Sequence, residues 1–416
     1  MGGQGLFLRS ENPDGAVDLT RWNTETVDCR PAPGGPAAFL TGAAVDSAFL
    51  KENVCLAREA MGTRFEVVLP KTRPGRNMSI FAVTPFDSDA AAQNAHIPTR
   101  SHAEAALEEI TILDRELSLF RRDSFLSFVN ANAQGRTVRV PPDLFELFAL
   151  CESVRVASRG AFDITVGPLM ECWGFHGGEG AQPDGDALAR ARTRVGGGKL
   201  TLDKEAFTLR FGTAGMRLDL GGVAKGFALD RAAETLRDEG VERALLHGGT
   251  STVVGLSGKG VWKVGVRAPA AGEVRAPAAE EVGASSPLLA TAYLENAALS
   301  VSAPQGRSFF AGGREQGHLI DPAAGSPAQG ALLAAVTAKN ATLADAWSTA
   351  FLVAGPEGFD DLVPRAEGVL AAMLYTGPGD GGRLLIAGPH PETFAKPETA
   401  DLTNPGKNRK LEKERK

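Results

Sequence analysis

Stretches typical of helices and stretches typical of strands are interspersed along this chain, without the strand–helix–strand repeat of a doubly wound parallel sheet. Apolar residues recur at helical spacing after a capping box formed by Ser101 and Glu104. Further helices are predicted at residues 143–160, 226–239 and 341–355. Short β-rich runs that predict strands lie at residues 62–70, 207–211, 217–220, 243–247, 261–266 and 331–338. This order predicts an α+β fold with mainly antiparallel sheets and packed helices.

Composition suggests one large folded region with variable ends. Of the 416 residues, 43% are hydrophobic and 23% are charged, which suffices for a sizeable core. We expect an N-terminal extension over residues 1–53, a single domain over 54–395 and a charged tail over 396–416. Within the domain, residues 71–100 and 268–287 lack helix or strand patterns and are predicted to be surface insertions.

Charge and cysteine content argue against several kinds of protein. The chain has 44 Lys and Arg against 50 Asp and Glu, a net charge of −6, which argues against nucleic acid or an anionic membrane as partner. Cys29, Cys55, Cys151 and Cys172 are far apart, so neither a zinc site nor a dense disulfide framework is indicated. No apolar run of 18 residues and no signal peptide is visible. The compartment stays undecided.

The segment RLDLGGVAKGFALD, residues 217–230, joins a predicted strand to a helix through paired glycines. Glycines let the backbone approach a ligand closely, and the N–H groups at a helix start favour an anion. Lys225 adds a positive charge suited to phosphate. The alternative is a tight turn with a surface lysine. A P-loop is excluded, because the Lys-Ser/Thr pair that follows the last glycine of that pattern is absent.

The segment LADAWSTA, residues 343–350, has oxygen donors on one predicted helix. Asp345 and Thr349 lie four residues apart and therefore share a helical face, with Ser348 beside them. Mg²⁺ takes hard oxygen ligands, often one or two carboxylates together with substrate phosphates. The pattern is compatible with a magnesium site. It is equally compatible with an Asp345 that faces solvent or caps the helix.

Two further segments contain polar residues in suggestive settings. His318 in HLIDP, residues 318–322, lies at a strand end before a proline turn and could act as a general base or contact a ligand. Asp163 and Thr165 are flanked by apolar residues in GAFDITVGPLMECWGF, residues 160–175. The alternatives are a turn histidine with satisfied hydrogen bonds and an aspartate that caps a turn. HGGTS hints at an oxyanion hole, but no G-x-S-x-G elbow occurs, which argues against a serine hydrolase.

Together and in this order, the segments resemble the ApbE-type FAD:protein FMN transferases. The similarity covers about residues 55–375. The six blocks that resemble the family's motifs are AMGTRFEV, LDRELSLFRRDSFLSFVNAN, AFDITVGPLMECWGF, LDLGGVAKGFALD, HLIDPAAGSP and TLADAWSTAFLVAG. The resemblance implies an α+β domain related to the T-fold, with FAD held in a cleft between its parts.

The resemblance also implies site residues. Those implied to contact FAD are Met61, Phe120, Ala161, Phe162, Asp163, Asp219, Lys225, His318 and Leu319. Met61 and Phe120 would line the flavin or the adenine. The residues implied to hold Mg²⁺ are Asp345, Thr349 and Ser348, with the backbone carbonyl of Gly222.

The implied activity is a magnesium-dependent transfer that cleaves FAD, attaches FMN to a Thr or Ser of an acceptor flavoprotein and releases AMP. Lys225 and Mg²⁺ would stabilise charge on the pyrophosphate, and His318 or a carboxylate such as Asp345 would help to deprotonate the acceptor hydroxyl. Two alternatives remain. One is an FAD pyrophosphatase that yields FMN and AMP, and the other is a non-catalytic FAD-binding protein.

Some positions depart from the family's motifs. LHGGTS has Leu246 and Thr250 where the family reads N-x-G-G-D, while Ala303 and Ala324 replace a usual Gly and Thr. We expect these changes to affect the cleft walls and the choice of substrate. No stretch resembles the target motif D-G-x-[ST]-[GS]-A-T, so the acceptor is expected to be a separate protein. Membrane association is expected only through the acceptor or an anchor not visible in this sequence.

Overall fold

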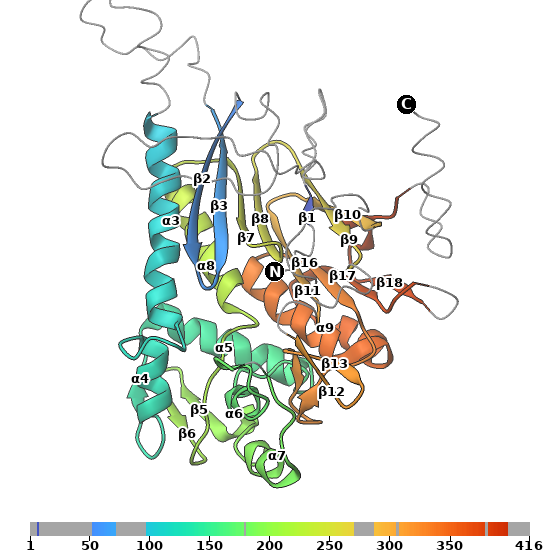
Figure 1. Ribbon diagram of the computed structural model, residues 1–416. Coiled ribbons are helices and arrows are strands. Elements are labelled where there is room, and N and C mark those ends of the chain that lie inside the picture. Colours follow the sequence, from blue (N-terminus) through green and yellow to red (C-terminus); the bar gives the residue numbers. More distant parts are fainter. Residues whose placement is uncertain are drawn as a thin grey trace, which may run out of the picture.

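The computed structural model describes residues 6–7, 52–71, 97–178, 180–269, 287–304, 308–378 and 382–397. Its centre is an eight-stranded sheet in which every neighbouring pair is antiparallel (Figure 1). In spatial order its strands are β18 (Leu384–Ala387), β17 (Val369–Tyr375), β16 (Leu333–Ala338), β11 (Ala297–Ser302), β8 (Thr252–Ser257), β7 (Arg243–Gly248), β3 (Thr63–Pro70) and β2 (Asn53–Ala60).

Both faces of this sheet are covered. Helices α3 (Ile97–Leu117), α8 (Ala224–Asp238) and α9 (Ala341–Leu362) pack on one face. The other face packs on a four-stranded sheet of β1 (Leu6–Phe7), β9 (Trp262–Arg267), β10 (Leu288–Leu294) and β19 (Phe394–Ala395). Because successive strand residues point to opposite faces, Val67 of β3 belongs to the helix-side core and Val68 to the core between the sheets. The two cores explain why the central strands are apolar at nearly every position.

A smaller region lies at the end of the sheet where α3 finishes (Figure 1). Its helices are α4 (Phe125–Asn132), α5 (Pro142–Ala157), α6 (Gly167–Cys172) and α7 (Gly185–Arg192), with the 3-10 turn η1 (Gly197–Lys199). It also contains a three-stranded sheet of β4 (Val138–Arg139), β6 (Thr208–Phe211) and β5 (Leu200–Asp203). Two hairpins complete it, β12 (Ser308–Ala311) with β13 (Arg314–Gly317) and β14 (Ile320–Asp321) with β15 (Ser326–Pro327). Two 3-10 turns, η2 (Val363–Arg365) and η3 (Pro391–Thr393), lie elsewhere.

The first turns of α8 and α9 lie against each other. An added Cβ at Gly226 would lie 2.3 Å from the carbonyl oxygen of Ala341, so only glycine permits this approach. Asp230 of α8 accepts hydrogen bonds from the backbone N–H groups of Ala341 and Thr342 at 2.8 Å, and so caps α9. Asn340 caps the same helix by accepting from the N–H of Leu343 at 2.9 Å. These contacts fix the relative position of the two helices that bear the candidate phosphate and metal residues.

The predicted α+β architecture with antiparallel sheets and packed helices is confirmed. The predicted helices correspond to α3, α5, α8 and α9, and Gly240 follows α8 with a φ of 78°, as expected of a glycine after a helix. Helix α9 continues past its predicted end at residue 355, because the chain resumes a helix after a non-helical Gly355. Five of the predicted strands correspond to β3, β6, β7, β9 and β16.

Two local predictions are wrong. Residues 217–220 form no strand; Arg217 makes only an isolated bridge to Val166. The backbone of Leu218 instead bonds the side-chain amide of Asn130, through its N–H at 2.7 Å and its carbonyl at 3.0 Å. The capping box is wrong as well, because α3 begins at Ile97 and Ser101 lies inside it. Residues 97–100 of the predicted 71–100 insertion are therefore helical.

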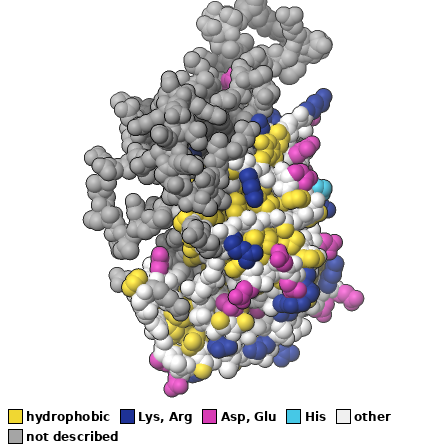
Figure 2. All heavy atoms as spheres, turned by 90° about the vertical axis from the view of Figure 1, so that its right-hand side faces the viewer, with side chains coloured by type: hydrophobic (Ala, Val, Ile, Leu, Met, Phe, Trp, Pro, Cys, Tyr) yellow, Lys and Arg dark blue, Asp and Glu magenta, His cyan; other side chains and the backbone are white. Residues whose placement is uncertain are grey.

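Most of the predicted insertions and ends lie outside the described residues. This holds for 72–96 and 270–286, for the tail beyond residue 397 and for the N-terminal extension apart from β1 and residues 52–53, of which Asn53 begins β2. Figure 2 shows one face of the described part, on which Lys and Arg are interspersed with Asp and Glu and gather into no extended patch of one sign. No helix among the described residues is both long enough and apolar enough to cross a membrane.

Candidate active site

A cavity of about 670 Å³ opens between the eight-stranded sheet and the smaller region. Its volume is in the usual range for small-molecule sites, about 300–1,000 Å³. Eleven of the predicted site residues line it: Met61, Phe120, Ala161, Phe162, Asp163, Asp219, Gly222, Lys225, His318, Leu319 and Thr349. Of the predicted residues, Asp345 and Ser348 do not line it; they are buried next to it. The structure thus brings together residues that are up to 288 positions apart, from Met61 to Thr349.

The turn between β2 and β3 presents Met61 to the cavity. Met61 and Gly62 both have positive φ, 49° and 71°, and they join Ala60 directly to Thr63 in a two-residue hairpin. Such a turn matches the twist of the strands but is unfavourable for a residue with a side chain. Asp114 of α3 holds it by accepting a hydrogen bond from the N–H of Met61 at 2.8 Å. Asp114 also lines the cavity and was not predicted from the sequence.

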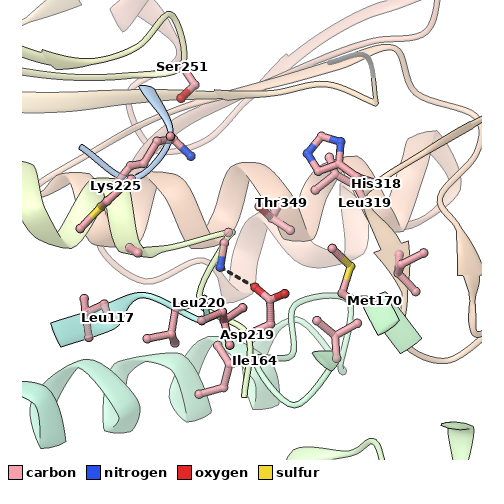
Figure 3. A pocket seen from close by; sticks show the side chains of 18 of the residues that line it. Leu117, Ile164, Met170, Asp219, Leu220, Lys225, Ser251, His318, Leu319 and Thr349 are labelled. Carbon is pink, nitrogen blue, oxygen red and sulfur yellow. Dashed lines mark hydrogen bonds between the residues drawn. The ribbon is translucent and has the colours of Figure 1, made fainter. Parts of the chain in front are cut away.

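Lys225 lies in the first turn of α8 and extends into the cavity (Figure 3). It is partly buried, and its ammonium group forms no hydrogen bond or ion pair with any of the described residues. A lysine without a protein partner beside a helix start favours an anionic ligand, because both contribute positive electrostatic potential. The surface-lysine alternative is therefore disfavoured.

Asp345 is buried beneath the cavity, with 3% of its surface exposed. Its Oδ2 accepts a hydrogen bond from the backbone N–H of Gly226 at 3.0 Å. Its Oδ1 accepts from the hydroxyls of Ser300 at 2.7 Å and Thr252 at 3.2 Å. No described residue forms an ion pair with it, although a buried carboxylate normally has a cationic partner. The solvent-facing alternative for Asp345 is wrong.

Thr349 follows Asp345 by one helical turn and does reach the cavity (Figure 3). Gly222 lies directly against it, since an added Cβ on Gly222 would be 3.2 Å from the Thr349 hydroxyl. Ser348 points elsewhere and bonds the hydroxyl of Ser302 at 2.8 Å. Thr349 and Gly222 therefore lie together at the cavity wall, and the carboxylate of Asp345 is buried one helical turn away, while Ser348 is engaged within the protein.

Asp163 is engaged by its own loop. Its Oδ1 accepts hydrogen bonds from the N–H and hydroxyl of Thr165 at 2.8 and 2.7 Å, and its Oδ2 accepts from the N–H of Gly197 at 2.9 Å. The carboxylate of Asp163 therefore caps a turn, as the alternative interpretation of the sequence predicted. Asp321 is similar, because its Oδ1 accepts from the N–H of Ala323 at 2.8 Å.

Asp219 and His176 form a close pair in the cavity. The His176 Nε2 lies 2.6 Å from the Asp219 Oδ2, and the Asp219 Oδ1 accepts the N–H of Gly221 at 2.7 Å (Figure 3 marks the second bond). Burial by itself would raise the pKa of the Asp219 carboxyl. The hydrogen bond and charge of His176, the Gly221 N–H and the charge of His318 lower the pKa below its usual value. His176 was missed from the sequence, because it follows Phe175 in a glycine-rich turn without periodicity.

Comparisons with known proteins identify the family of this chain. The sequence profile of the ApbE family matches residues 61–374. The chain belongs to the ApbE family. A relative from Rhodobacter capsulatus named FAD:protein FMN transferase is 33% identical over 251 residues, which cover 60% of this ApbE-family chain and 45% of that relative. One of the same name from Klebsiella pneumoniae (strain 342) is 30% identical over 277 residues, covering 64% of this chain and 75% of the relative.

A solved structure has the same fold. The ApbE protein of Thermotoga maritima superposes with a TM-score of 0.64 at 25% identity, covering 80% of this chain and 96% of that one. These relatives confirm the expected family and the α+β fold. They also confirm the expectation that the chain is an enzyme of the flavin-transferase family. The match spans less than half the length of the Rhodobacter relative.

The positions at which this ApbE-family chain departs from the family's motifs are mostly away from the cavity. Leu246 is fully buried in the core, and neither Ala303 nor Ala324 lines the cavity. Thr250 does line it, together with Gly249 and Ser251 of the same loop. Of these departures, only Thr250 therefore changes the wall of the cavity.

Proposed function

We propose that this chain is a magnesium-dependent FAD:protein FMN transferase that attaches FMN through a phosphoester to a Thr or Ser hydroxyl of an acceptor flavoprotein and releases AMP. The observation that supports this most is one cavity of dinucleotide size, lined by His318, by Thr349 with Gly222, and by Lys225, which pairs with none of the described residues. The same arrangement fits the names of the relatives, both FAD:protein FMN transferase.

The residues present fit a magnesium ion better than a transition metal. Among the described residues, no group of three or more His, Cys, Asp or Glu side chains is placed to hold a metal. Mg²⁺ does not need such a group, since it binds through one or two carboxylates together with waters and substrate phosphates. Asp345 supplies a buried carboxylate that forms no ion pair with any described residue, and Thr349 and the carbonyl of Gly222 would supply neutral oxygens. When bound, the ion would neutralise negative charge that develops on the phosphoryl oxygens.

The reaction exchanges one phosphorus–oxygen bond for another. The acceptor hydroxyl oxygen bonds to the FMN phosphorus, the bridging bond of the pyrophosphate breaks, and AMP leaves with the bridging oxygen. Lys225 binds the pyrophosphate and stabilises its increasing charge, and the cavity walls hold the two halves of FAD in position.

The hydroxyl proton passes to a base, for which we propose His318. His318 lines the cavity, whereas Asp345 accepts three hydrogen bonds and does not line it.

One experiment separates this proposal from its alternatives. The protein is incubated with FAD, Mg²⁺ and an acceptor fragment that contains the family's target motif, and a denaturing gel is read for flavin fluorescence while AMP is assayed. Fluorescence that stays with the acceptor supports the transferase. AMP without a labelled acceptor would identify an FAD pyrophosphatase, and intact bound FAD without AMP would identify a non-catalytic FAD-binding protein.

A further inference from the structure

The pair of His176 and Asp219 has a feature that the proposed reaction does not use. The His176 side chain is 13% exposed and lines the cavity, and its Nε2 is bonded to Asp219 at 2.6 Å. Its other ring nitrogen, Nδ1, forms no hydrogen bond with any described residue. Nδ1 is therefore open to the cavity, and a ring nitrogen at the wall of a substrate-sized cavity can form a hydrogen bond with the ligand.

The contacts of Asp219 determine which nitrogen bears the proton. Asp219 is buried and has a lowered pKa, so its carboxylate is ionised at neutral pH and can only accept hydrogen bonds. The hydrogen between the two side chains therefore resides on Nε2 of His176. Nδ1 is an acceptor in the neutral imidazole, whereas the imidazolium, whose charge lowers the pKa of Asp219, donates from both nitrogens. Gly221 holds the carboxylate in place from its other oxygen.

A planar ring of the substrate is the natural partner of this acceptor. Phe120 lies next to His176, with ring centroids 6.4 Å apart and planes at 88°, and it is 65% exposed although it lines the cavity. A large aromatic side chain left open at a cavity wall offers a face for stacking. A ring stacked on Phe120 would lie beside the neighbouring imidazole.

We propose that His176 contacts the substrate directly in its neutral form, with Nδ1 accepting a hydrogen bond from an N–H on the edge of a planar ring stacked on Phe120. Asp219 is then a positioning residue, which acts through His176 by fixing its tautomer. FAD has two such N–H groups, the amino group of adenine and the imide N–H of the flavin. The inference rests on the proposed function and adds a specificity-determining residue to it.

The test uses the two halves of the substrate separately. Binding of AMP and of FMN is measured by calorimetry for the wild-type protein, for His176→Phe and for the control His102→Phe. His102 is a partly exposed histidine of α3 that lies outside the cavity. We expect His176→Phe to weaken one of the two ligands by about two- to ten-fold, the loss of one neutral hydrogen bond, and to leave the other unchanged. The ligand that weakens identifies the ring.

The first part of a second measurement uses the wild-type protein with altered ligands and so does not depend on how well a variant folds. The wild-type protein is titrated with AMP and its analogue without the amino group, and with FMN and its analogue methylated at the imide nitrogen. The analogue that lacks the bonded N–H should bind about two- to ten-fold more weakly to the wild type, and His176→Phe should not discriminate against it. The KM for FAD should rise by the same factor in His176→Phe, with kcat changed much less.

The contradicting outcomes are distinct. If wild-type protein transfers FMN, but His176→Phe binds AMP and FMN as the wild type does, the role of His176 is wrong and the proposed function stands. The same holds if the wild type binds both analogues as tightly as the natural ligands. If the wild type binds neither AMP nor FMN and forms no labelled acceptor, the proposed function itself is wrong.

Discussion

The buried carboxylate of Asp345 allows a sharp test of the metal site by Asp345→Asn. The substitution keeps the size of the side chain and removes its charge. Its amide oxygen can accept the N–H of Gly226, and its NH₂ can donate to Ser300 and Thr252, whose hydroxyls can rotate to accept. We therefore expect a stability loss of only about 1–2 kcal/mol. Asp345→Ala is less informative, because it leaves three buried donors without an acceptor at about 1–3 kcal/mol each.

The same substitution should strongly reduce transfer. If Asp345 provides the negative charge for Mg²⁺, its loss should lower kcat/KM by more than about a hundred-fold, comparable to losing a major electrostatic contribution. The assay pairs urea unfolding, which measures the fold, with transfer rates over a range of Mg²⁺ concentrations. Asp184→Asn is the control, because Asn caps the start of α7 as well as Asp does. A well-folded Asp345→Asn that transfers FMN at the wild-type rate and Mg²⁺ requirement would refute the assignment.

Three further predictions test the surroundings of the site. Lys225→Met should lower kcat/KM for FAD by about a hundred-fold or more, because a partner of the pyrophosphate is lost. The control is Lys204→Met at an exposed lysine, which should keep the wild-type value. A Lys225→Met protein with the wild-type kcat/KM would exclude the phosphate role. Gly226→Ala should lower the free energy of unfolding by about 1–3 kcal/mol or more, because its Cβ would lie 2.3 Å from the Ala341 carbonyl oxygen. The control Gly185→Ala places its Cβ in open space and should not lower it. Comparing the urea unfolding midpoints of both variants with that of the wild type tests this, and equal midpoints for both variants would contradict it. Burial raises the pKa of Asp230 to about 6 despite the opposing hydrogen bonds from Thr342 and Ala341. The folded chain then binds more protons than the unfolded one, so the free energy of unfolding should fall as pH rises from about 4 to 6, by about 3 kcal/mol at most. Asp230→Asn should lack this dependence. Parallel plots of the free energy of unfolding against pH for the wild type and Asp230→Asn would contradict it.

Much of the fold follows from local patterns in the sequence. Periodic apolar residues and a closing glycine define α5 and α8, and β-rich runs define β3 and β7, because each of these elements buries a face whose apolar residues are visible in the local sequence. The segment 217–220 has a strand-like composition, yet the side chain of Asn130, 88 residues away from Leu218, takes the place of a neighbouring strand. A long-range partner of this kind leaves no local signal.

In the candidate site, too, local patterns predicted some residues, and long-range contacts placed others. The motif residues of α8 and α9 were predicted, and helical spacing correctly placed Asp345 and Thr349 on one side of their helix. Spacing could not show that Thr349 reaches the cavity while Asp345 lies beneath it, held by hydroxyls from two strands. His176 was missed because its role depends on Asp219, 43 residues further along the chain. Such pairs are created by the tertiary structure and not by the sequence pattern.

The central claim is that this chain moves FMN from FAD onto another protein. The most direct measurement is the intact mass of an acceptor fragment after incubation with FAD and Mg²⁺, together with the amount of AMP formed. We predict that the acceptor gains the mass of one FMN phosphoester on a Thr or Ser, with one AMP released for each acceptor labelled. An acceptor of unchanged mass, whether FAD is hydrolysed or stays intact, would contradict the claim.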